Sequence, residues 1–146
     1  MADVTFAIDA QSVSATRLDV SAREFTFIVD EPAKLGGSNA GPNPVEYLLG
    51  ALAGCINVVG YLVAKEMGFT IEELAIHIEG SLDSLAFLGK KPDVRPGYQE
   101  IRVRCDVRTS ADAETLAHWL RTVEARCPVS DNLAHATPLH MTVQSW

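Results

Sequence analysis

The sequence predicts an α+β fold in which an antiparallel β-sheet packs on one long apolar central helix, with a second helix beside it. Three features predict it: a strand-rich start, an uncharged run over residues 47–64, and two alternating segments that precede an amphipathic helix. The expected order is three strands, a helix, two strands, two helices and a last strand. Consecutive strands favour antiparallel pairing, because parallel βαβ units would need strict alternation of strand and helix.

The first part of the chain predicts three strands in a hairpin or meander. Residues 4–10 and 13–22 alternate weakly between apolar and polar, and residues 25–29 are aromatic and β-branched, as strands prefer. Pro32 ends the third strand. The glycine-rich stretch 36–42 that follows predicts a loop.

Residues 44–67 predict the long helix. Asn43 is a suitable N-cap, Pro44 suits the first helical position, and Glu46 places a negative charge in the first turn. Gly68 is expected to end the helix. The run approaches the length that a bilayer needs, but an asparagine and three glycines interrupt it and no basic cluster flanks it. We therefore expect a buried central helix and no membrane partner.

One face of this helix is expected to carry apolar side chains spaced three and four residues apart. They are Val45, Leu48, Leu52, Cys55, Val59 and Leu62. Gly50 and Gly54, one turn apart, would let another helix approach closely. A single domain of this size has little else with which to surround so apolar a helix, so we expect the same helix of a second subunit to cover it in a homodimer.

The second half of the chain predicts two half-buried antiparallel strands and two helices. Residues 74–82 and 101–107 alternate between apolar and polar. The proline-broken basic segment 90–97 between them is expected to be a solvated loop, with a loop that gates a substrate pocket as the alternative. Ser110 is a suitable cap for a helix that runs to about residue 126. Its buried stripe is expected to be Leu116, Trp119, Leu120 and Val123. Pro128 opens a short third helix, and residues 139–146 predict the last strand.

Length and composition exclude several classes of protein. The 146 residues fit one domain, over residues 1–146, and a net charge of −7 would repel a long polyanion, so nucleic acid is not an expected partner. The N-terminus lacks the features of a signal peptide, and the three cysteines cannot all pair within the chain. We expect a cytoplasmic protein with reduced thiols. Its cysteines and four histidines show no metal-ligand spacing, so no metal is expected.

Two cysteines have settings that suggest a thiol redox site. Cys55 lies midway along the apolar helix and Cys127 directly precedes Pro128, so only the fold could bring them together. Cys127 at a helix N-cap would gain thiolate stabilisation from backbone N–H groups, whereas Cys55 gains none locally. Each could instead be a small buried apolar residue. Cys105 lies on the apolar face of its strand and is expected to be structural.

These cysteines stand in segments that resemble one known family. The chain resembles the OsmC/Ohr family of thiol-dependent peroxidases, and most of all its OsmC-like branch. The segments that carry the resemblance are Asn43-Pro44-x-Glu46 leading to Cys55, Cys127-Pro128-Val129-Ser130, Asp30-Glu31-Pro32 and Gly36-Gly37.

The resemblance implies an OsmC-like fold in an intertwined homodimer that acts in the oxidative stress response. It also implies that the protein reduces organic hydroperoxides, with Cys55 as the peroxidatic and Cys127 as the resolving thiol. The reductant would be a small or protein-borne dithiol, and no cofactor is needed because sulfur carries the electrons itself.

The family also implies a charged partner for the peroxidatic thiol. An arginine from the N-terminal strands, held by a glutamate, would stabilise the thiolate, and both Arg17 and Arg23 are candidates here. Val45 occupies the position of that glutamate, and Glu46 follows it, about 100° further around the helix. Glu46 either does this work differently or only favours the helix N-terminus. This departure keeps an alternative open: an OsmC-fold protein that binds a small apolar ligand, with weak or no peroxidase activity.

Overall fold

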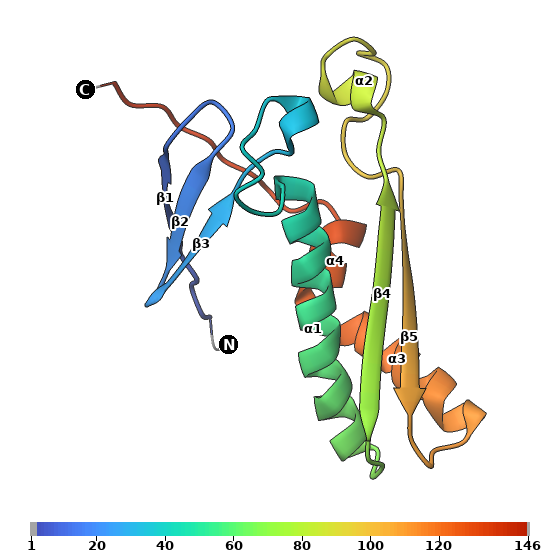
Figure 1. The fold of residues 1–146 in the computed structure, drawn as a ribbon. Helices are drawn as coiled ribbons and strands as arrows, with labels where there is room; N and C mark the ends of the chain where they lie inside the picture. The colour runs from blue at the N-terminus through green and yellow to red at the C-terminus, as the bar shows by residue number, and fades with distance from the viewer. Residues whose placement is uncertain (1–2, 146) are drawn as a thin grey trace. The chain divides into compact units, whose positions relative to one another are not determined.

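The computed structural model describes residues 3–145, which form two compact units divided between Leu48 and Leu49. The elements in chain order are β1 (Asp9–Ser12), β2 (Leu18–Ala22), β3 (Phe25–Val29), the 3₁₀ helix η1 (Ala33–Leu35), α1 (Pro44–Glu66), β4 (Glu73–Ser81), α2 (Ser84–Phe87), β5 (Glu100–Arg108), α3 (Ala113–Arg126) and α4 (Pro128–Ala134) (Figure 1). All strand pairs are antiparallel. The α+β class is confirmed.

The first unit contains a three-stranded meander with β2 at its centre. Val20 of β2, which is buried, lies opposite residues of both β1 and β3. β3 has the predicted bounds, but β1 and β2 are displaced or shorter than expected. Residues 4–8 form no strand, and the segment before β2 is a turn in which the N–H groups of Val13 and Ser14 donate to the carbonyl oxygen of Arg17. Backbone groups used in that turn cannot also pair across the sheet.

A buried carboxylate organises the loop that leads to α1. Asp30 accepts hydrogen bonds from the Ser38 hydroxyl (2.6 Å), the Ser38 N–H (3.0 Å) and the Ala40 N–H (3.1 Å). These bonds, the Ser38 hydroxyl first, hold the pKa of Asp30 well below its usual range. Gly37 fits here because a Cβ atom would lie 1.8 Å from the carbonyl oxygen of Glu31. The loop therefore closes around Asp30.

Both ends of α1 follow the predicted local chemistry. The Asn43 side chain accepts from the Glu46 N–H (2.9 Å), and the Glu46 carboxylate accepts from the Asn43 N–H (2.8 Å), which is a reciprocal capping box. At the other end Gly68 adopts φ +78°, and the Phe69 N–H donates to the carbonyl oxygen of Ala64 (3.1 Å). This is a Schellman motif, so Gly68 ends the helix as expected.

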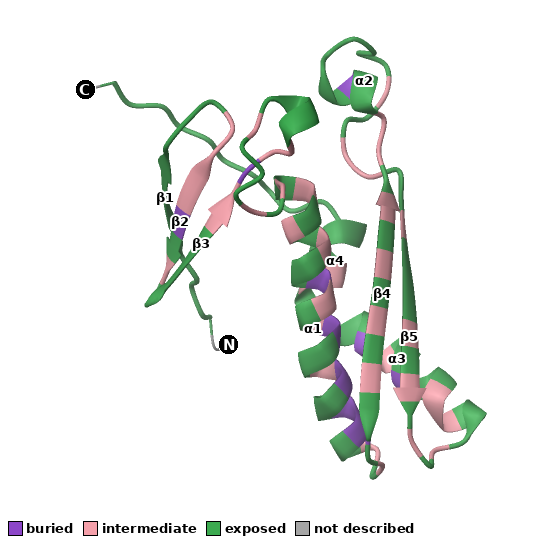
Figure 2. Ribbon diagram, in the orientation of Figure 1, coloured by how far each residue is buried: buried purple, intermediate pink, exposed green. Residues whose placement is uncertain are grey.

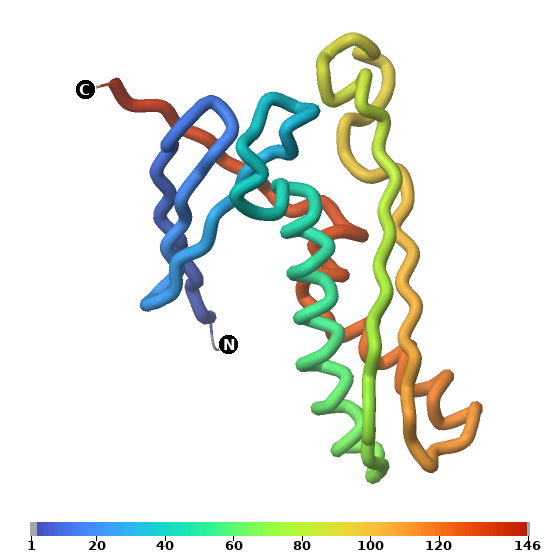
Figure 3. The backbone as a smooth tube through the Cα atoms, in the orientation of Figure 1, coloured from blue at the N-terminus to red at the C-terminus, as the bar shows by residue number. Residues whose placement is uncertain are grey.

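The second unit is built on a long β4–β5 hairpin, whose strands run side by side along their whole length (Figure 3). Ile76 lies opposite Cys105 and Ile78 opposite Val103. The connection between the strands contains α2, which sequence reasoning missed because its four residues show no helical period. Asp83 caps α2 and its carboxylate also binds the Lys91 ammonium group (2.7 Å). The basic segment is a loop, as predicted.

Two predictions near the C-terminus were wrong. Asp112, not Ser110, caps α3, because its side chain stands next to the first helical residue and accepts from the Thr115 N–H (2.8 Å). Residues 139–145 form no strand, and Val143 is 98% exposed. Among the described residues this segment has no pairing strand, and an unpaired segment is not a β-strand. Trp146 lies outside the described residues.

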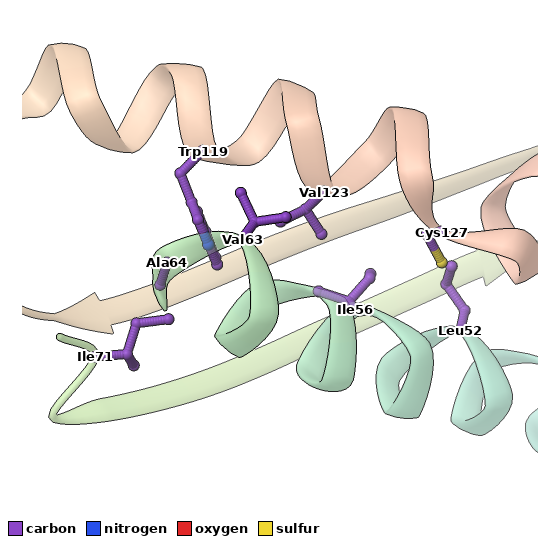
Figure 4. Close-up of a cluster of buried hydrophobic side chains, with 8 residues drawn as sticks. All are labelled: Leu52, Ile56, Val63, Ala64, Ile71, Trp119, Val123 and Cys127. Atoms are coloured by element: carbon purple, nitrogen blue, oxygen red, sulfur yellow. The ribbon is translucent and has the colours of Figure 1, made fainter. Parts of the chain in front are cut away.

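A single apolar cluster holds α1, α3 and the hairpin together in the second unit. Its buried members are Leu52, Ile56, Val63, Ala64, Ile71, Trp119, Val123 and Cys127 (Figure 4). The indole N–H of Trp119 donates to the carbonyl oxygen of Gly60 (2.8 Å), so the buried ring also has its polar atom satisfied. A Cβ atom at residue 60 would lie 3.0 Å from the ring. α3 thus packs closely against α1 at this point.

Only one side of α1 is buried (Figure 2). It matches the predicted stripe in part, because Leu52 is buried and Cys55 and Val59 pack against the core cluster. Leu48 and Leu62 are 39% and 47% exposed, and Leu120 of α3, also expected inside, is 47% exposed. Within the chain α3 and the hairpin cover a single face of α1, so only 28% of its most apolar window is buried. Among the described residues, α1 alone is long and apolar enough to cross a bilayer. This length and composition are weak evidence for a membrane span, since the core helix of a soluble protein has them too.

Candidate functional site

The structure brings Cys55 and Cys127 together within the second unit. Cys55 lies on α1 between Leu52 and Ile56, two members of the core cluster, and Cys127 belongs to the same cluster. The two thiols interact, since Cys127 raises the pKa of the Cys55 thiol. Both are free thiols. The 72 positions that separate them in the sequence are therefore bridged by the packing of α3 on α1.

The fold fixes Cys127 through two helices at once. On α3, Trp119, Val123 and Cys127 recur at every fourth residue and face α1, so burial of the first two carries Cys127 into the core (Figure 4). Cys127 ends α3 and caps α4, where its Sγ accepts from the Ser130 N–H (3.3 Å). The predicted N-cap position of Cys127 is confirmed. Only 1% of this residue is exposed.

The environment of Cys55 contains opposing electrostatic effects. Burial raises the pKa of the Cys55 thiol, the hydrogen bond with Cys127 raises the pKa further, and a hydrogen bond from the Val129 backbone N–H lowers it. The first turn of α4 thus donates to both sulfur atoms, through Val129 to Cys55 and through Ser130 to Cys127. This contribution to Cys55 comes from a helix distant in sequence, so it is compatible with the expectation that Cys55 gains none locally.

Cys105 has the surroundings of a packing residue. It lies on β5 opposite Ile76, is half-buried, and packs against the core cluster. Burial raises the pKa of its thiol, with a smaller contribution from Asp106. A thiol with a raised pKa forms little thiolate at neutral pH and is a weak nucleophile.

The three charged residues that sequence reasoning singled out all lie in the first unit. Arg17 makes a bidentate ion pair with Asp19, from Nε to Oδ1 (2.9 Å) and from Nη2 to Oδ2 (3.2 Å). Arg23 sits at the β2–β3 turn with φ +56°, and its guanidinium lies over the Phe25 ring, 5.0 Å from the centroid. The Glu46 carboxylate is occupied by the capping box. Glu46 therefore has a structural task of its own.

The histidines form no second site. Within residues 3–145 no group of three or more His, Cys, Asp and Glu side chains could hold a metal ion. His77 is exposed on the polar face of β4, and His135, the histidine nearest to α4, is an exposed side chain paired with Asp131 (3.1 Å).

A cavity of about 460 Å³ in the second unit has Cys127 in its wall. α1, β5, α3 and α4 contribute mostly apolar side chains, and Arg95 and Tyr98 contribute from the loop before β5. Its volume is in the range of small-molecule sites. Its lining comes from three stretches of the chain, residues 52–56, 95–103 and 120–134, which no local sequence pattern connects.

Comparison with solved structures shows the same fold in several proteins. An OsmC-like protein from Mycoplasma pneumoniae has a TM-score of 0.81 and 21% identity, over 92% of this chain and 91% of that chain. Organic hydroperoxide resistance proteins from Legionella pneumophila and Elizabethkingia anophelis each have a TM-score of 0.64. The first is 18% identical, over 91% of both chains, and the second 17%, over 92% of this chain and 91% of that chain.

The sequence matches none of the curated proteins with which it was compared. The family model described as OsmC-like protein, in contrast, matches residues 36–142. That span contains α1, the β4–β5 hairpin, α3, α4 and both cysteines of the pair. With most of its length matched by this model, the chain belongs to the OsmC-like protein family.

Proposed function

We propose that this protein is a cysteine-based peroxidase that reduces organic hydroperoxides and is regenerated by a dithiol. The observation that carries the proposal is that Cys55 packs against the buried cluster that contains Cys127, whose thiol raises the pKa of Cys55. Two neighbouring thiols can form a disulfide, which a single buried cysteine cannot do. Two solved proteins with this fold are named organic hydroperoxide resistance proteins, which adds support.

The reaction would proceed in three steps. The Cys55 thiolate attacks the terminal peroxide oxygen, the O–O bond breaks, and the organic fragment leaves as an alcohol after taking up a proton. Cys127 then attacks the resulting sulfenic acid, which releases water and forms the Cys55–Cys127 disulfide. A dithiol reduces this disulfide and is itself oxidised to a disulfide, so no cofactor is needed. Hydrogen bonds from the Val129 and Ser130 N–H groups would support the two thiolates.

Cys55 also requires a positive charge, because burial raises the pKa of its thiol. We propose that Arg17 or Arg23 supplies it. Arg17 is already neutralised in part by its bidentate pair with Asp19, which favours Arg23 as the source of uncompensated charge. For Glu46, the capping box supports a role in holding the start of α1 over a role in holding the arginine.

We further propose that the protein works as a cytoplasmic intertwined homodimer, without nucleic acid or membrane partners. The argument rests on the face of α1 that the chain leaves open. Val58, Tyr61 and Leu62 are exposed there, and a Cβ atom at Gly50 or Gly54 would meet nothing within 4 Å. A second copy of α1 is suited to this surface. Burial of the exposed apolar side chains between two identical faces would stabilise a symmetric dimer.

Substitution of single cysteines tests the proposed activity. Cys55→Ser is expected to abolish dithiol-dependent turnover of cumene hydroperoxide, while Cys105→Ser, the matched control on β5, leaves turnover intact. Alcohol production measured by chromatography gives the rate. Full activity in Cys55→Ser, or loss only in Cys105→Ser, would contradict the proposal.

A second function is favoured by two observations, the raised pKa of Cys55 and the cavity of about 460 Å³. In that case the protein would bind a small apolar ligand and react poorly with peroxide. The thiol pKa separates the two functions. A Cys55 pKa well below the unperturbed value of ~8.5 supports the peroxidase, and a value at or above it supports the binder.

A further inference from the structure

Cys127 has a second task besides its place in the thiol pair, because its side chain also caps α4. The Sγ atom accepts a hydrogen bond from the Ser130 N–H (3.3 Å), one of the N–H groups that the start of a helix leaves without an intrahelical partner. The same side chain points from the end of α3 toward Leu52 of α1 (Figure 4). One sulfur atom therefore belongs both to the buried pair and to the start of a helix.

α4 depends strongly on this cap. The helix spans seven residues, and none of them is buried, although Val129 packs against the core cluster. Isolated helices shorter than ~12 residues are marginal in water, so capping and packing decide whether such a helix persists. The far end of α4 is closed by an exposed pair, in which the His135 imidazole lies 3.1 Å from the Asp131 carboxylate. Exposed pairs of this kind stabilise little.

We propose that α4 is a redox-responsive element: formation of the Cys55–Cys127 disulfide withdraws its N-cap, and the start of the helix opens in the oxidised protein. The inference rests on the proposed peroxidase function, because it requires that disulfide. It gives Cys127 a conformational role in addition to its chemical one.

Disulfide formation changes what each sulfur atom offers to α4. The hydroperoxide oxidises Cys55 to a sulfenic acid and is reduced to an alcohol; Cys127 then forms the S–S bond, and the sulfenic oxygen leaves as water. The new bond turns the two sulfur atoms toward each other. A disulfide sulfur also carries no negative charge, so it is a weaker acceptor than a thiolate. The first turn of α4 donates to both sulfur atoms, through Val129 and Ser130, so the reaction affects both hydrogen bonds.

The loss of the cap would carry the oxidation state of a buried pair to the surface of the second unit. Cys127 is only 1% exposed, but Ser130 and Leu133 of α4 line the cavity of about 460 Å³. Loss of an N-cap shifts the equilibrium of a helix by a factor of roughly 2 to 30. One wall of the cavity would therefore be more mobile in the oxidised protein than in the reduced one.

Amide hydrogen exchange, followed by NMR on isotope-labelled protein, tests this inference. Exchange is measured in the reduced protein and after one equivalent of cumene hydroperoxide, with the disulfide confirmed by mass spectrometry. The Ser130 amide is expected to exchange roughly 2 to 30 times faster after oxidation, while the amide of Val123 on α3 exchanges no faster. An unchanged Ser130 rate in protein that carries the disulfide would overturn the inference. Failure to form the disulfide would instead refute the peroxidase function, and the inference with it.

Two variants separate the cap from other effects of oxidation. Cys127→Ser replaces the sulfur by the hydroxyl oxygen of a preferred N-cap residue and cannot form the disulfide. Its Ser130 amide should exchange no faster than in the reduced wild type, before and after peroxide. Cys105→Ser, the matched control, keeps the pair and the cap and should show the same rise on oxidation as the wild type. A rise in Cys127→Ser, or equal acceleration at Ser130 and Val123 in the wild type, would contradict loss of the cap as the cause.

Discussion

The contact between Gly60 and Trp119 determines how closely α3, which carries Cys127, packs on α1, which carries Cys55. A Cβ atom at residue 60 would lie 3.0 Å from Trp119 Cζ2, well inside ordinary carbon contact. Replacement of a helical glycine by alanine normally stabilises a helix by about 1 kcal/mol. Here overpacking against the buried ring would cost about 1–3 kcal/mol. We expect Gly60→Ala to lower the free energy of unfolding by roughly 0–2 kcal/mol.

A double-mutant cycle isolates this contact. Trp119→Phe removes the atom that the new methyl group would strike and also the 2.8 Å hydrogen bond to the Gly60 carbonyl oxygen. In that background Gly60→Ala should be stabilising, so the coupling energy between the two substitutions should be about 1–3 kcal/mol, favouring the double variant. Urea unfolding followed by fluorescence and circular dichroism measures all four proteins. A coupling energy near zero would refute the packing of α3 on α1 described above.

Three further predictions concern charged groups. Glu46→Gln keeps the capping box but removes the charge in the first turn, so it should cost at most about 1 kcal/mol in urea unfolding and leave peroxide turnover intact. Asn43→Ala should cost about 0.5–2 kcal/mol. Lost turnover in a stable Glu46→Gln would show that the charge is needed. Folding lowers the pKa of Asp30, so its carboxylate stabilises the protein above pH ~4, and this stabilisation is lost as the pH falls toward the folded pKa. The difference in melting temperature between wild type and Asp30→Asn should therefore narrow from pH 5 to pH 3. A gap independent of pH would refute this. Arg23→Gln, and to a smaller extent Arg17→Gln, should move the midpoint of Cys55 alkylation to higher pH, since loss of a cation raises a thiol pKa. An unchanged midpoint in both variants would exclude the two arginines.

The parts of the fold that depend on neighbouring residues were predictable from the sequence. Asn43 and Gly68 bound α1 because their caps use only residues of the adjacent turns. Cys127 caps α4 for the same reason, with Pro128 at the first helical position. The strands β4 and β5 carry an alternation that a short segment shows by itself, and β3 has the aromatic and β-branched residues that strands prefer.

The features that the sequence could not show depend on contacts between distant segments. Which face of α1 is buried follows from where Trp119 and β4 lie, so the apolar spacing placed Leu52 correctly but also placed Leu48 and Leu62, which are exposed, on the buried side. The Val129 N–H that supports Cys55 comes from a helix that follows more than seventy residues later. The strand expected over residues 139–146 shows that a local pattern can also predict an element that does not form. Its alternation is typical of a strand, but the described residues offer it no partner.

The formation of a disulfide by the thiol pair is the central claim and can be measured directly. One equivalent of cumene hydroperoxide is added to the fully reduced protein, and peptides are mapped without reduction. The account predicts one Cys55–Cys127 disulfide per chain, with Cys105 recovered as a free thiol. Recovery of Cys55 as sulfinic or sulfonic acid, with Cys127 still reduced, would contradict it.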